Sequence, residues 1–290
     1  MKRAILFRFH ASPGVCRNRI QLLRLFNPGT DILGLYGGDE DAFPRFASRL
    51  EGDLDGLYCV RGRSPGWKWK NGDLAIYDWY RDHGRRFSFD VVHVVEWDLL
   101  LFNPVAEVFR HVPLDAVGVA KLRPVSEYAD EWVWTSHEPH RTQWLELLRL
   151  ARDAHGYSGE PYTCNFAGAS LPRAFLERCS GAAIPPLVND EARLPLFAQA
   201  FGFTLVDNQL FDASRPDEER YFNLRGIDIR DEVVFRETMK KDGRRVFHPY
   251  KKVYHHLTTS GRAYNAYYFF ARRLLNYRRW RRFSSKAAIS

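Results

Sequence analysis

The sequence predicts an α/β protein built on a mainly parallel, doubly wound β-sheet. Through the first half, short apolar runs alternate with helical segments, a pattern typical of β-α-β units. The strongest run, residues 89–98, has valine at positions that would face both sides of a sheet, so we expect a strand buried on both faces. The second half is less regular, and a basic C-terminal helix is expected after it.

Each element of the first half has its own sequence signal. Residues 4–9 are almost all apolar and start the first strand. Residues 13–26 enter a helix and repeat apolar side chains at helical spacing. The next strand ends at the turn-forming pair Gly37-Gly38, and Gly84 suits the C-cap of the following helix. In chain order we expect strands at 4–9, 31–36 and 56–60, a loop that enters a helix within 13–26, a helix at 71–84, and the valine-rich strand within 89–98.

The second half mixes shorter elements with irregular segments. Residues 141–154 place Trp144, Leu147 and Ala151 on one side of an amphipathic helix. A run of small residues at 165–170 precedes a further helix. In chain order we expect a strand at 116–122, helices at 141–154, 172–179 and 191–200, and a short strand at 203–207.

Composition and charge limit the class of protein. The 290 residues suffice for one large domain or two small ones. No apolar run approaches the ~20 residues that span a bilayer. The four cysteines form no Cys-x-x-Cys pair, so we expect reduced cytosolic thiols. Eight of the 43 Lys and Arg residues lie in 257–290, which contains no acid. Residues 1–256 therefore carry 35 basic and 35 acidic residues. This balance of charge argues against a nucleic-acid groove across 1–256.

The valine-rich strand ends in two carboxylates, Glu96 and Asp98. Side chains two residues apart on an extended chain point the same way, so both can face one site. The carboxyl ends of strands are where open α/β sheets bind ligands, and two oxygen ligands suit a divalent cation that bridges to phosphate. About four acid-x-acid triplets are expected by chance and the chain has five, but only this one follows a buried strand. A surface turn after a core strand is the alternative.

In their order, these segments resemble the GT-A glycosyltransferases, which use sugar nucleotides. The first strand, from Ile5 to His10, starts at the N-terminus as in that fold. Glu96-Trp97-Asp98 is similar to the family's Asp-x-Asp motif, with Glu in the first place. The resemblance covers 1–256 in order and rough spacing, as one domain with a nucleotide-sugar-binding half at 1–110 and an acceptor half at 111–256.

Three later segments also carry the resemblance. Residues 165–176 are similar to the acceptor-side strand and helix of the family. Asn189-Asp190-Glu191 resembles the place where inverting members keep a catalytic carboxylate. His248-Pro249-Tyr250-Lys251 resembles the late histidine segment that completes the metal site. The tail, 257–290, lies outside the resemblance.

The resemblance implies a divalent cation, Mn²⁺ or Mg²⁺, at the carboxylate motif. Asp98 would be its direct ligand, and Glu96 would hold the ribose, the metal or a metal-bound water. His248 would be a neutral imidazole ligand, which Mn²⁺ tolerates. His255 and His256 are rivals for that place. The alternative for His248 is a turn histidine beside a proline.

The resemblance also implies roles on the donor side. Arg8 and His10 would meet the base and ribose of the nucleotide, with a UDP-sugar as the expected donor. Asp73 would hold the nucleotide, and Lys70 would reach its diphosphate as a mobile point charge. The alternatives are surface charges beside a Pro-Gly turn for Arg8 and His10, and a helix N-cap for Asp73.

On the acceptor side, Glu191 is the candidate general base that would deprotonate the acceptor hydroxyl. Asp190 is the second candidate. The alternative is a plain helix start, because Asn-Asp-Glu before an apolar helix also describes an N-cap with acids in the first turn. Trp67 and Trp69, in a loop rich in Gly and Pro, are candidates for an acceptor platform.

The tail interleaves aromatic and basic residues over 263–283. This composition suits an amphipathic helix at an anionic membrane surface. A helix that docks its aromatic side chains on the core is an alternative, and a nucleic-acid contact is a third interpretation.

Together these features predict a metal-dependent, inverting glycosyltransferase. Its acceptor would be a carbohydrate or a glycolipid in surface polysaccharide or glycolipid synthesis. We expect it to work in the cytoplasm, peripherally on the inner face of the membrane. The alternatives are a glycosyltransferase that acts on a modified DNA base, and a non-catalytic phosphate- or nucleic-acid-binding α/β module.

Overall fold

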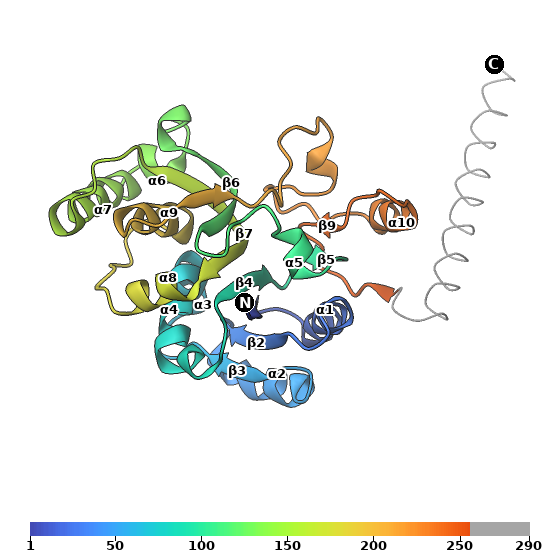
Figure 1. Ribbon diagram of the computed structural model, residues 1–290. Helices are drawn as coiled ribbons and strands as arrows, with labels where there is room; N and C mark the ends of the chain where they lie inside the picture. The colour runs from blue at the N-terminus through green and yellow to red at the C-terminus, as the bar shows by residue number, and fades with distance from the viewer. Residues whose placement is uncertain (256–290) are drawn as a thin grey trace, which may run out of the picture. The chain divides into compact units, whose positions relative to one another are not determined.

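A twisted seven-stranded sheet runs through the part of the chain that the computed structural model describes, residues 1–255 (Figure 1). Its spatial order is β3-β2-β1-β4-β7-β6-β8. A second sheet of two short strands, β5 (Leu100–Leu101) and β9 (Val246–Phe247), lies beside it. The large sheet consists of β1 (Arg3–Phe9), β2 (Asp31–Tyr36), β3 (Gly56–Cys59), β4 (Val91–Glu96), β6 (Val117–Pro124), β7 (Tyr162–Pro172) and β8 (Leu205–Asp207).

The predicted mainly parallel sheet is confirmed. β1 pairs in parallel with β2 on one side and with β4 on the other, β2 pairs in parallel with β3, and β6 pairs in parallel with β8. The exception is β7, which runs antiparallel between β4 and β6. The pattern of apolar residues predicts the other six strands of this sheet. For β7 only the resemblance implies a strand, and neither signal encodes its direction.

Helices cover the two faces of the sheet, because successive strand residues point to opposite sides. Ile5 and Phe7 face a cluster that includes α1 (Pro13–Phe26), α2 (Phe43–Leu50) and α5 (Val105–Val108). Ala4 and Leu6 face a second cluster with α4 (Gly72–Asp82), α8 (Arg173–Ser180) and α9 (Asp190–Ala200). Beyond α9, a third cluster packs α7 (His140–His155) against it, and α7 ends at Gly156 with φ of 66°.

One predicted loop is a helix. Residues 65–70, expected as a Gly- and Pro-rich segment, form α3 (Pro65–Lys70). Ser64 accepts a hydrogen bond from the Trp67 backbone N–H at 3.2 Å, and Pro65 occupies the first helical position, where a missing N–H costs nothing. The further elements are α6 (Val133–Ser136), α10 (Asp231–Met239) and 3₁₀ turns at Glu40–Ala42, Gly84–Arg86, Val125–Glu127 and Glu218–Arg220.

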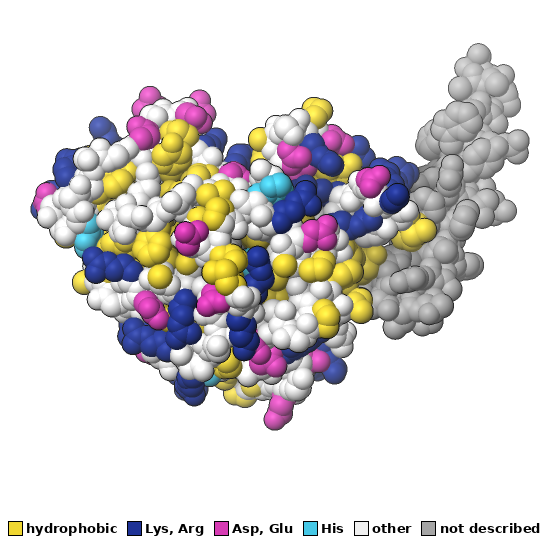
Figure 2. Space-filling model, viewed as in Figure 1, with side chains coloured by type: hydrophobic (Ala, Val, Ile, Leu, Met, Phe, Trp, Pro, Cys, Tyr) yellow, Lys and Arg dark blue, Asp and Glu magenta, His cyan; other side chains and the backbone are white. Residues whose placement is uncertain are grey.

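The chain divides into two compact units, Met1–Lys251 and Lys252–Ser290. All elements named above belong to the first unit, and the predicted domain end at residue 256 stays a prediction. The tail over 257–290 and His256 lie outside the described residues. Among the described helices, none has the length and apolar character needed to cross a membrane. On the face in Figure 2, acidic and basic side chains are interspersed, without a continuous basic stripe.

The order of strands reverses at β1. From β1 the chain moves outward through β2 and β3, and β4 then lies on the other side of β1. In doubly wound sheets, ligands bind beyond the carboxyl ends of the strands at this switch point. Arg8 of β1 lies directly opposite Glu96 of β4 in the strand register, so both side chains lie at this edge.

Candidate active site

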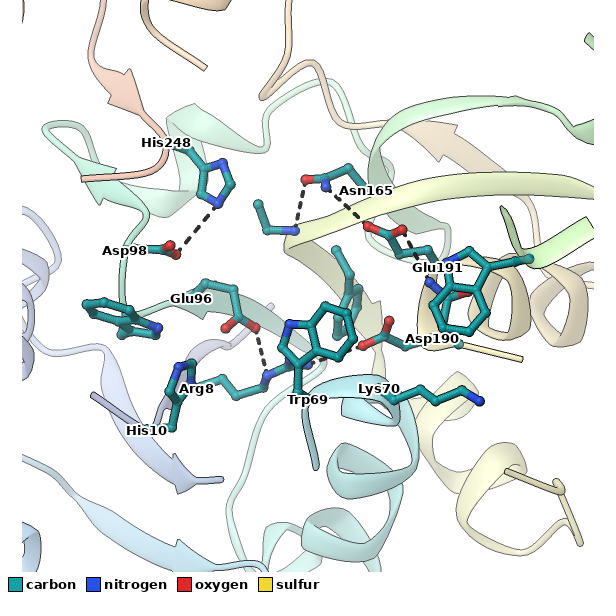
Figure 3. A pocket seen from close by; sticks show the side chains of 15 residues that line it. Arg8, His10, Trp69, Lys70, Glu96, Asp98, Asn165, Asp190, Glu191 and His248 are labelled. Atoms are coloured by element: carbon teal, nitrogen blue, oxygen red, sulfur yellow. Dashed lines mark hydrogen bonds and ion pairs between the residues drawn. The ribbon is translucent and has the colours of Figure 1, made fainter. Parts of the chain in front are cut away.

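A cleft opens at the switch point, beyond the carboxyl ends of β1 and β4 (Figure 3). Residues far apart in the sequence, from Arg8 to His248, meet there, because β1, β4, α9 and the segment after β9 converge on this edge. Eight of the nine residues predicted for the site line the cleft: Arg8, His10, Lys70, Glu96, Asp98, Asp190, Glu191 and His248.

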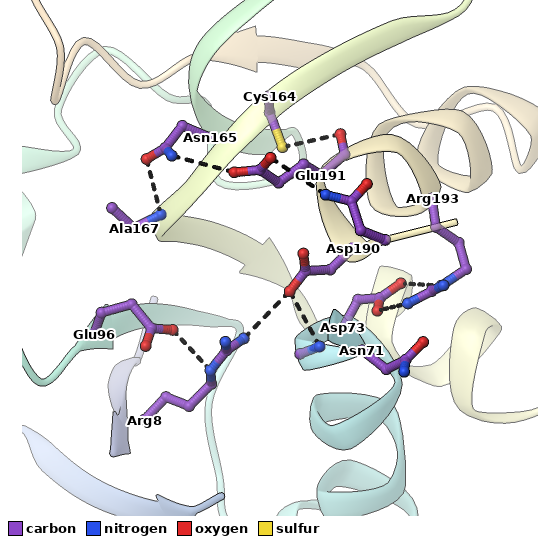
Figure 4. Close-up of polar contacts among 12 residues, drawn as sticks. Arg8, Asn71, Asp73, Glu96, Cys164, Asn165, Ala167, Asp190, Glu191 and Arg193 are labelled. Atoms are coloured by element: carbon purple, nitrogen blue, oxygen red, sulfur yellow. Dashed lines mark hydrogen bonds and ion pairs between the residues drawn. The ribbon is translucent and has the colours of Figure 1, made fainter. Parts of the chain in front are cut away.

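Arg8 bridges two carboxylates at the base of the cleft (Figure 4). Its Nε lies 2.9 Å from Oε1 of Glu96, and its Nη1 lies 3.6 Å from Oδ2 of Asp190. The backbone N–H of Gly72, at the start of α4, donates to the same Asp190 oxygen at 3.1 Å. A Cβ atom on Gly72 would lie 1.5 Å from Arg8 Nη1, so the approach of Arg8 requires glycine here. Arg8 therefore holds two acids together instead of standing free for a nucleotide base.

Burial shifts the pKa values of Arg8, Glu96 and Asp190. It raises the pKa of Glu96 to about 8, against the attraction of Arg8, which lowers it. Burial also raises the pKa of Asp190, helped by the charge of Asp73 and opposed by Arg8. For Arg8, burial acts to lower the pKa, but Glu96 and Asp190 outweigh it and the pKa rises. Arg8 thus stays cationic while its partners exchange protons near neutral pH.

Asp98 and His248 face one another at the other side of the cleft, with Oδ1 and Nε2 3.6 Å apart (Figure 3). The carbonyl of Asn223, 3.3 Å from Nδ1, can only accept a hydrogen bond, which assigns the proton to Nδ1 and the lone pair to Nε2. Burial lowers the pKa of His248, so the neutral ring is favoured. The Tyr250 N–H donates to the Asp98 carbonyl at 2.8 Å, which holds the segment with His248 next to the segment with Asp98.

A carboxylate and an imidazole lone pair that point at one another fit a divalent cation between them. Within residues 1–255, no three side chains of His, Cys, Asp or Glu come together as a ready-made metal site. Glu96, predicted as a ligand, is paired with Arg8. A cation here would take its remaining ligands from water and from the substrate's phosphates, as Mg²⁺ commonly does.

Glu191 lies in the first turn of α9 and is held by two amides (Figure 4). Asn165 donates to Oε1 at 3.2 Å and Asn189 donates to Oε2 at 3.3 Å. Asn189 is also the N-cap, because its Oδ1 accepts from the Ala192 N–H at 3.3 Å. Capping therefore does not use the carboxylates of Asp190 and Glu191, which separates two interpretations that the sequence left open.

The environment of Glu191 suits a base. Burial, with the charge of Asp190, raises its pKa to about 7, and hydrogen bonds from the Phe166 N–H, Asn189 and Asn165 limit the rise. General bases work best with a pKa close to the operating pH. Asn165 has no predicted role in the sequence, since an Asn at the start of a small-residue run carries no signal of its own.

Asp73, the ninth predicted residue, does not reach the cleft. Its side chain and that of Arg193 are both 0% exposed and form a two-pronged ion pair (Figure 4). Arg193 also donates to the Leu187 carbonyl at 2.7 Å. The predicted contact of Asp73 with a nucleotide is therefore wrong. Its charge is used to join α4 to α9, which sets Gly72 beside Asp190.

Aromatic side chains form one rim of the cleft. Trp69, at the end of α3, is 67% exposed, an unusual state for so large an apolar side chain. Lys70 Nζ lies 5.1 Å from the ring centroid of Trp134 and 3.4 Å from Gln143 Oε1. On the other side, the rings of His10 and Trp97 meet edge to face at 5.4 Å. The exposed indole of Trp69 beside a polar cleft suits the apolar face of a sugar ring.

A scan against protein-family models and a search of curated proteins each found no match. Among solved structures, the chain is similar to mouse xyloside xylosyltransferase 1, with a TM-score of 0.37, 10% identity, and coverage of 71% of this chain and 85% of that one. It is also similar to the galactosyltransferase LgtC in complex with donor and acceptor sugar analogs, with a TM-score of 0.39, 12% identity, and coverage of 80% of this chain and 81% of that one. A third similar structure is the bifunctional glycosyltransferase WbbM, with a TM-score of 0.39, 9% identity, and coverage of 71% of this chain and 38% of that one.

These proteins are glycosyltransferases by name, the kind of enzyme that the sequence resembles. TM-scores below 0.5 are too low for the likeness to assign an activity to this chain. The topology of the sheet and the geometry of the cleft carry the proposal that follows.

Proposed function

We propose that this chain is a glycosyltransferase that moves a sugar from a nucleoside diphosphate sugar to a hydroxyl acceptor. One observation carries the proposal. A single cleft at the switch point of the sheet brings together the Asp98–His248 pair and the base-type carboxylate Glu191. The first pair suits a cation that binds a diphosphate, and Glu191 suits a hydroxyl nucleophile. A metal-dependent, inverting transfer of a sugar from a nucleotide uses both functions.

On the donor side, Asp98 and His248 would hold Mn²⁺ or Mg²⁺. When bound, the ion would act as a Lewis acid on the diphosphate leaving group. Lys70 lines the same cleft and can carry a positive charge to the phosphates. The donor expected from the sequence is a UDP-sugar. Arg8 has a positioning role, because it holds Glu96 and Asp190 in place.

On the acceptor side, Glu191 would take the proton of the attacking hydroxyl. Asp190 is less available, because its Oδ2 already accepts from the Gly72 backbone and faces Arg8. A direct attack by the acceptor hydroxyl inverts the anomeric carbon. Proton NMR of the product formed from an α-linked donor should therefore show a β-linkage. An α-linked product would contradict the direct back-side attack, and with it the inverting mechanism.

Thermal unfolding tests donor binding. UDP at about 100 times its Kd, with Mn²⁺, should stabilise the protein by about 2.7 kcal/mol, or about 5 to 10 °C in Tm. Asp98→Ala should lose the part of this shift that depends on Mn²⁺. Asp41→Ala is the matched control, since Asp41 belongs to another acid-x-acid triplet and is exposed. If no nucleoside diphosphate gives a metal-dependent shift in the wild-type protein, the proposal fails.

We also propose that the acceptor belongs to a surface polysaccharide or a glycolipid and that the enzyme works at the inner face of a membrane. The sequence of the tail supports this setting, with eight basic residues and no acid over 257–290. Flotation with anionic liposomes, compared between the full chain and residues 1–256, tests it. Equal flotation of the two would remove the membrane part of the proposal.

A further inference from the structure

A second cleft adjoins the candidate active site at Glu191. Glu191 and Asn165 form a wall common to both clefts. The opposite wall carries Lys121 and Arg123 of β6 and Tyr128 just beyond it. Asp98 and His248 lie apart from Glu191 in Figure 3. The second cleft therefore opens where an acceptor would approach the base.

The backbone of β6 is irregular where it reaches this cleft. Its register against β7 shifts between Val119 and Ala120 and again between Ala120 and Arg123. Lys121 has φ of 52°, in the left-handed region that residues with a side chain rarely adopt. The next backbone N–H, of Leu122, donates to Asp207 Oδ2 at 2.8 Å and holds the bulge in place. Bulges of this kind re-aim side chains beside active sites.

Among residues 1–255, acids do act on the cations of this cleft: Glu191 lines its opposite wall, and the charge of Glu219 acts on Lys121. Neither Lys121 nor Arg123 forms an ion pair there, whereas Arg193 and Arg244, also partly or fully buried, pair with carboxylates. Aromatic rings support them instead. The guanidinium of Arg123 lies 3.5 Å from the ring centroid of Tyr128, and Lys121 Nζ lies 4.8 Å from that of Phe211. Two positive charges in a cleft, neither held in an ion pair within residues 1–255, are suited to bind an anion.

We propose that the acceptor is an acidic saccharide or glycolipid, and that its carboxylate or phosphate binds Lys121 and Arg123 while its hydroxyl reaches Glu191. This inference rests on the proposed function, because it names the class of the second substrate. Arg123 presents a planar fork that matches either anion, and Lys121 adds a point charge. No covalent step beyond the sugar transfer is involved.

Matched acceptor analogues test the inference. 4-Nitrophenyl glucuronide and a 4-nitrophenyl glucoside 6-phosphate are compared with the neutral 4-nitrophenyl glucoside, by NMR titration in the presence of UDP and Mn²⁺. We expect at least one anionic glycoside to bind roughly tenfold more tightly than the neutral one, as a charge-assisted contact implies. The better of the two anionic compounds distinguishes a carboxylate from a phosphate.

The double variant Lys121→Gln/Arg123→Gln should remove this preference. The control is Arg236→Gln/Lys241→Gln, which removes the same charge from exposed positions and should keep it. Equal binding of charged and neutral glycosides by the wild-type protein, or no binding of either, contradicts the inference. So does a double variant that loses UDP affinity but keeps the preference, since the cations would then serve the donor. UDP affinity is measured in the same samples, so a failure of donor binding, and with it of the proposed function, is recognised separately.

Discussion

Replacement of Glu191 by glutamine is expected to lower kcat by about 10²- to 10⁴-fold, the usual contribution of a general base. Glutamine keeps the size of the side chain and one carbonyl oxygen for Asn165 or Asn189, but it cannot accept a proton. The measurement is the turnover of a radiolabelled nucleotide sugar at saturating donor and acceptor. Glu146→Gln, at an exposed position on α7, is the control and should keep wild-type turnover.

The pH dependence of the reaction is a second test of Glu191 as the general base. A base must be deprotonated to work, so kcat/KM should rise with pH through about 7, the raised pKa of Glu191, and level off above it. If Glu191→Gln lowers kcat by only a few-fold and leaves the pH profile unchanged, Glu191 is not the general base. Asp190 then remains as the candidate.

The same substitution should stabilise the protein at alkaline pH. The folded-state pKa of Glu191 is raised from 4.5 to about 7, so the folded state keeps a proton that the unfolded state loses in that window. Stability therefore falls as pH rises from about 4.5 to 7. Glutamine avoids this loss, and with partial exposure taken into account the gain should be about 2 kcal/mol near pH 8 and almost nothing near pH 4.5. Urea unfolding at the two pH values measures it.

Replacement of Arg193 by alanine should have the largest effect on stability, a loss of about 3 to 5 kcal/mol. The substitution leaves the carboxylate of Asp73 fully buried without its partner. It should also lower kcat, because α4 and α9 lose the contact that sets Gly72 beside Asp190. Urea unfolding and turnover measure the two effects.

Two further variants make this prediction specific. Asp73→Leu/Arg193→Met removes both charges and should recover most of the stability, since an apolar pair can replace a buried ion pair. Arg149→Ala breaks the exposed pair with Asp153 and should cost about 0.5 kcal/mol or less. If Arg193→Ala destabilises no more than Arg149→Ala, the buried pair does not hold the two helices together.

Local sequence pattern predicts the first half of the fold well. β2 has the predicted bounds, 31–36, because its apolar run and the Gly37-Gly38 turn after it agree with the final packing. α1 begins at Pro13, earlier than the helix expected after a loop within 13–26. α3 was not predicted, since Pro and Gly mark both loops and helix starts. The antiparallel β7 was not predicted either, because direction depends on pairing between strands distant in sequence.

For the candidate site, too, local sequence predicts some residues and cannot predict contacts between distant segments. Acids at the end of a buried strand and at the start of a helix indicate Asp98 and Glu191, and the structure places both in one cleft. The Asp73–Arg193 pair joins residues 120 positions apart, so Asp73 has the same local pattern as a ligand-binding acid. Local sequence cannot distinguish a carboxylate that faces solvent from one that a distant arginine neutralises.

The most direct test of the account is pulsed electron paramagnetic resonance of Mn²⁺ bound to the protein with UDP. We expect one ion to show coupling both to a nitrogen of His248 and to the phosphorus nuclei of the diphosphate. The nitrogen coupling should vanish in His248→Gln, and Asp98→Asn should weaken Mn²⁺ binding. A bound ion with phosphorus coupling but no histidine nitrogen in the wild-type protein would contradict the account.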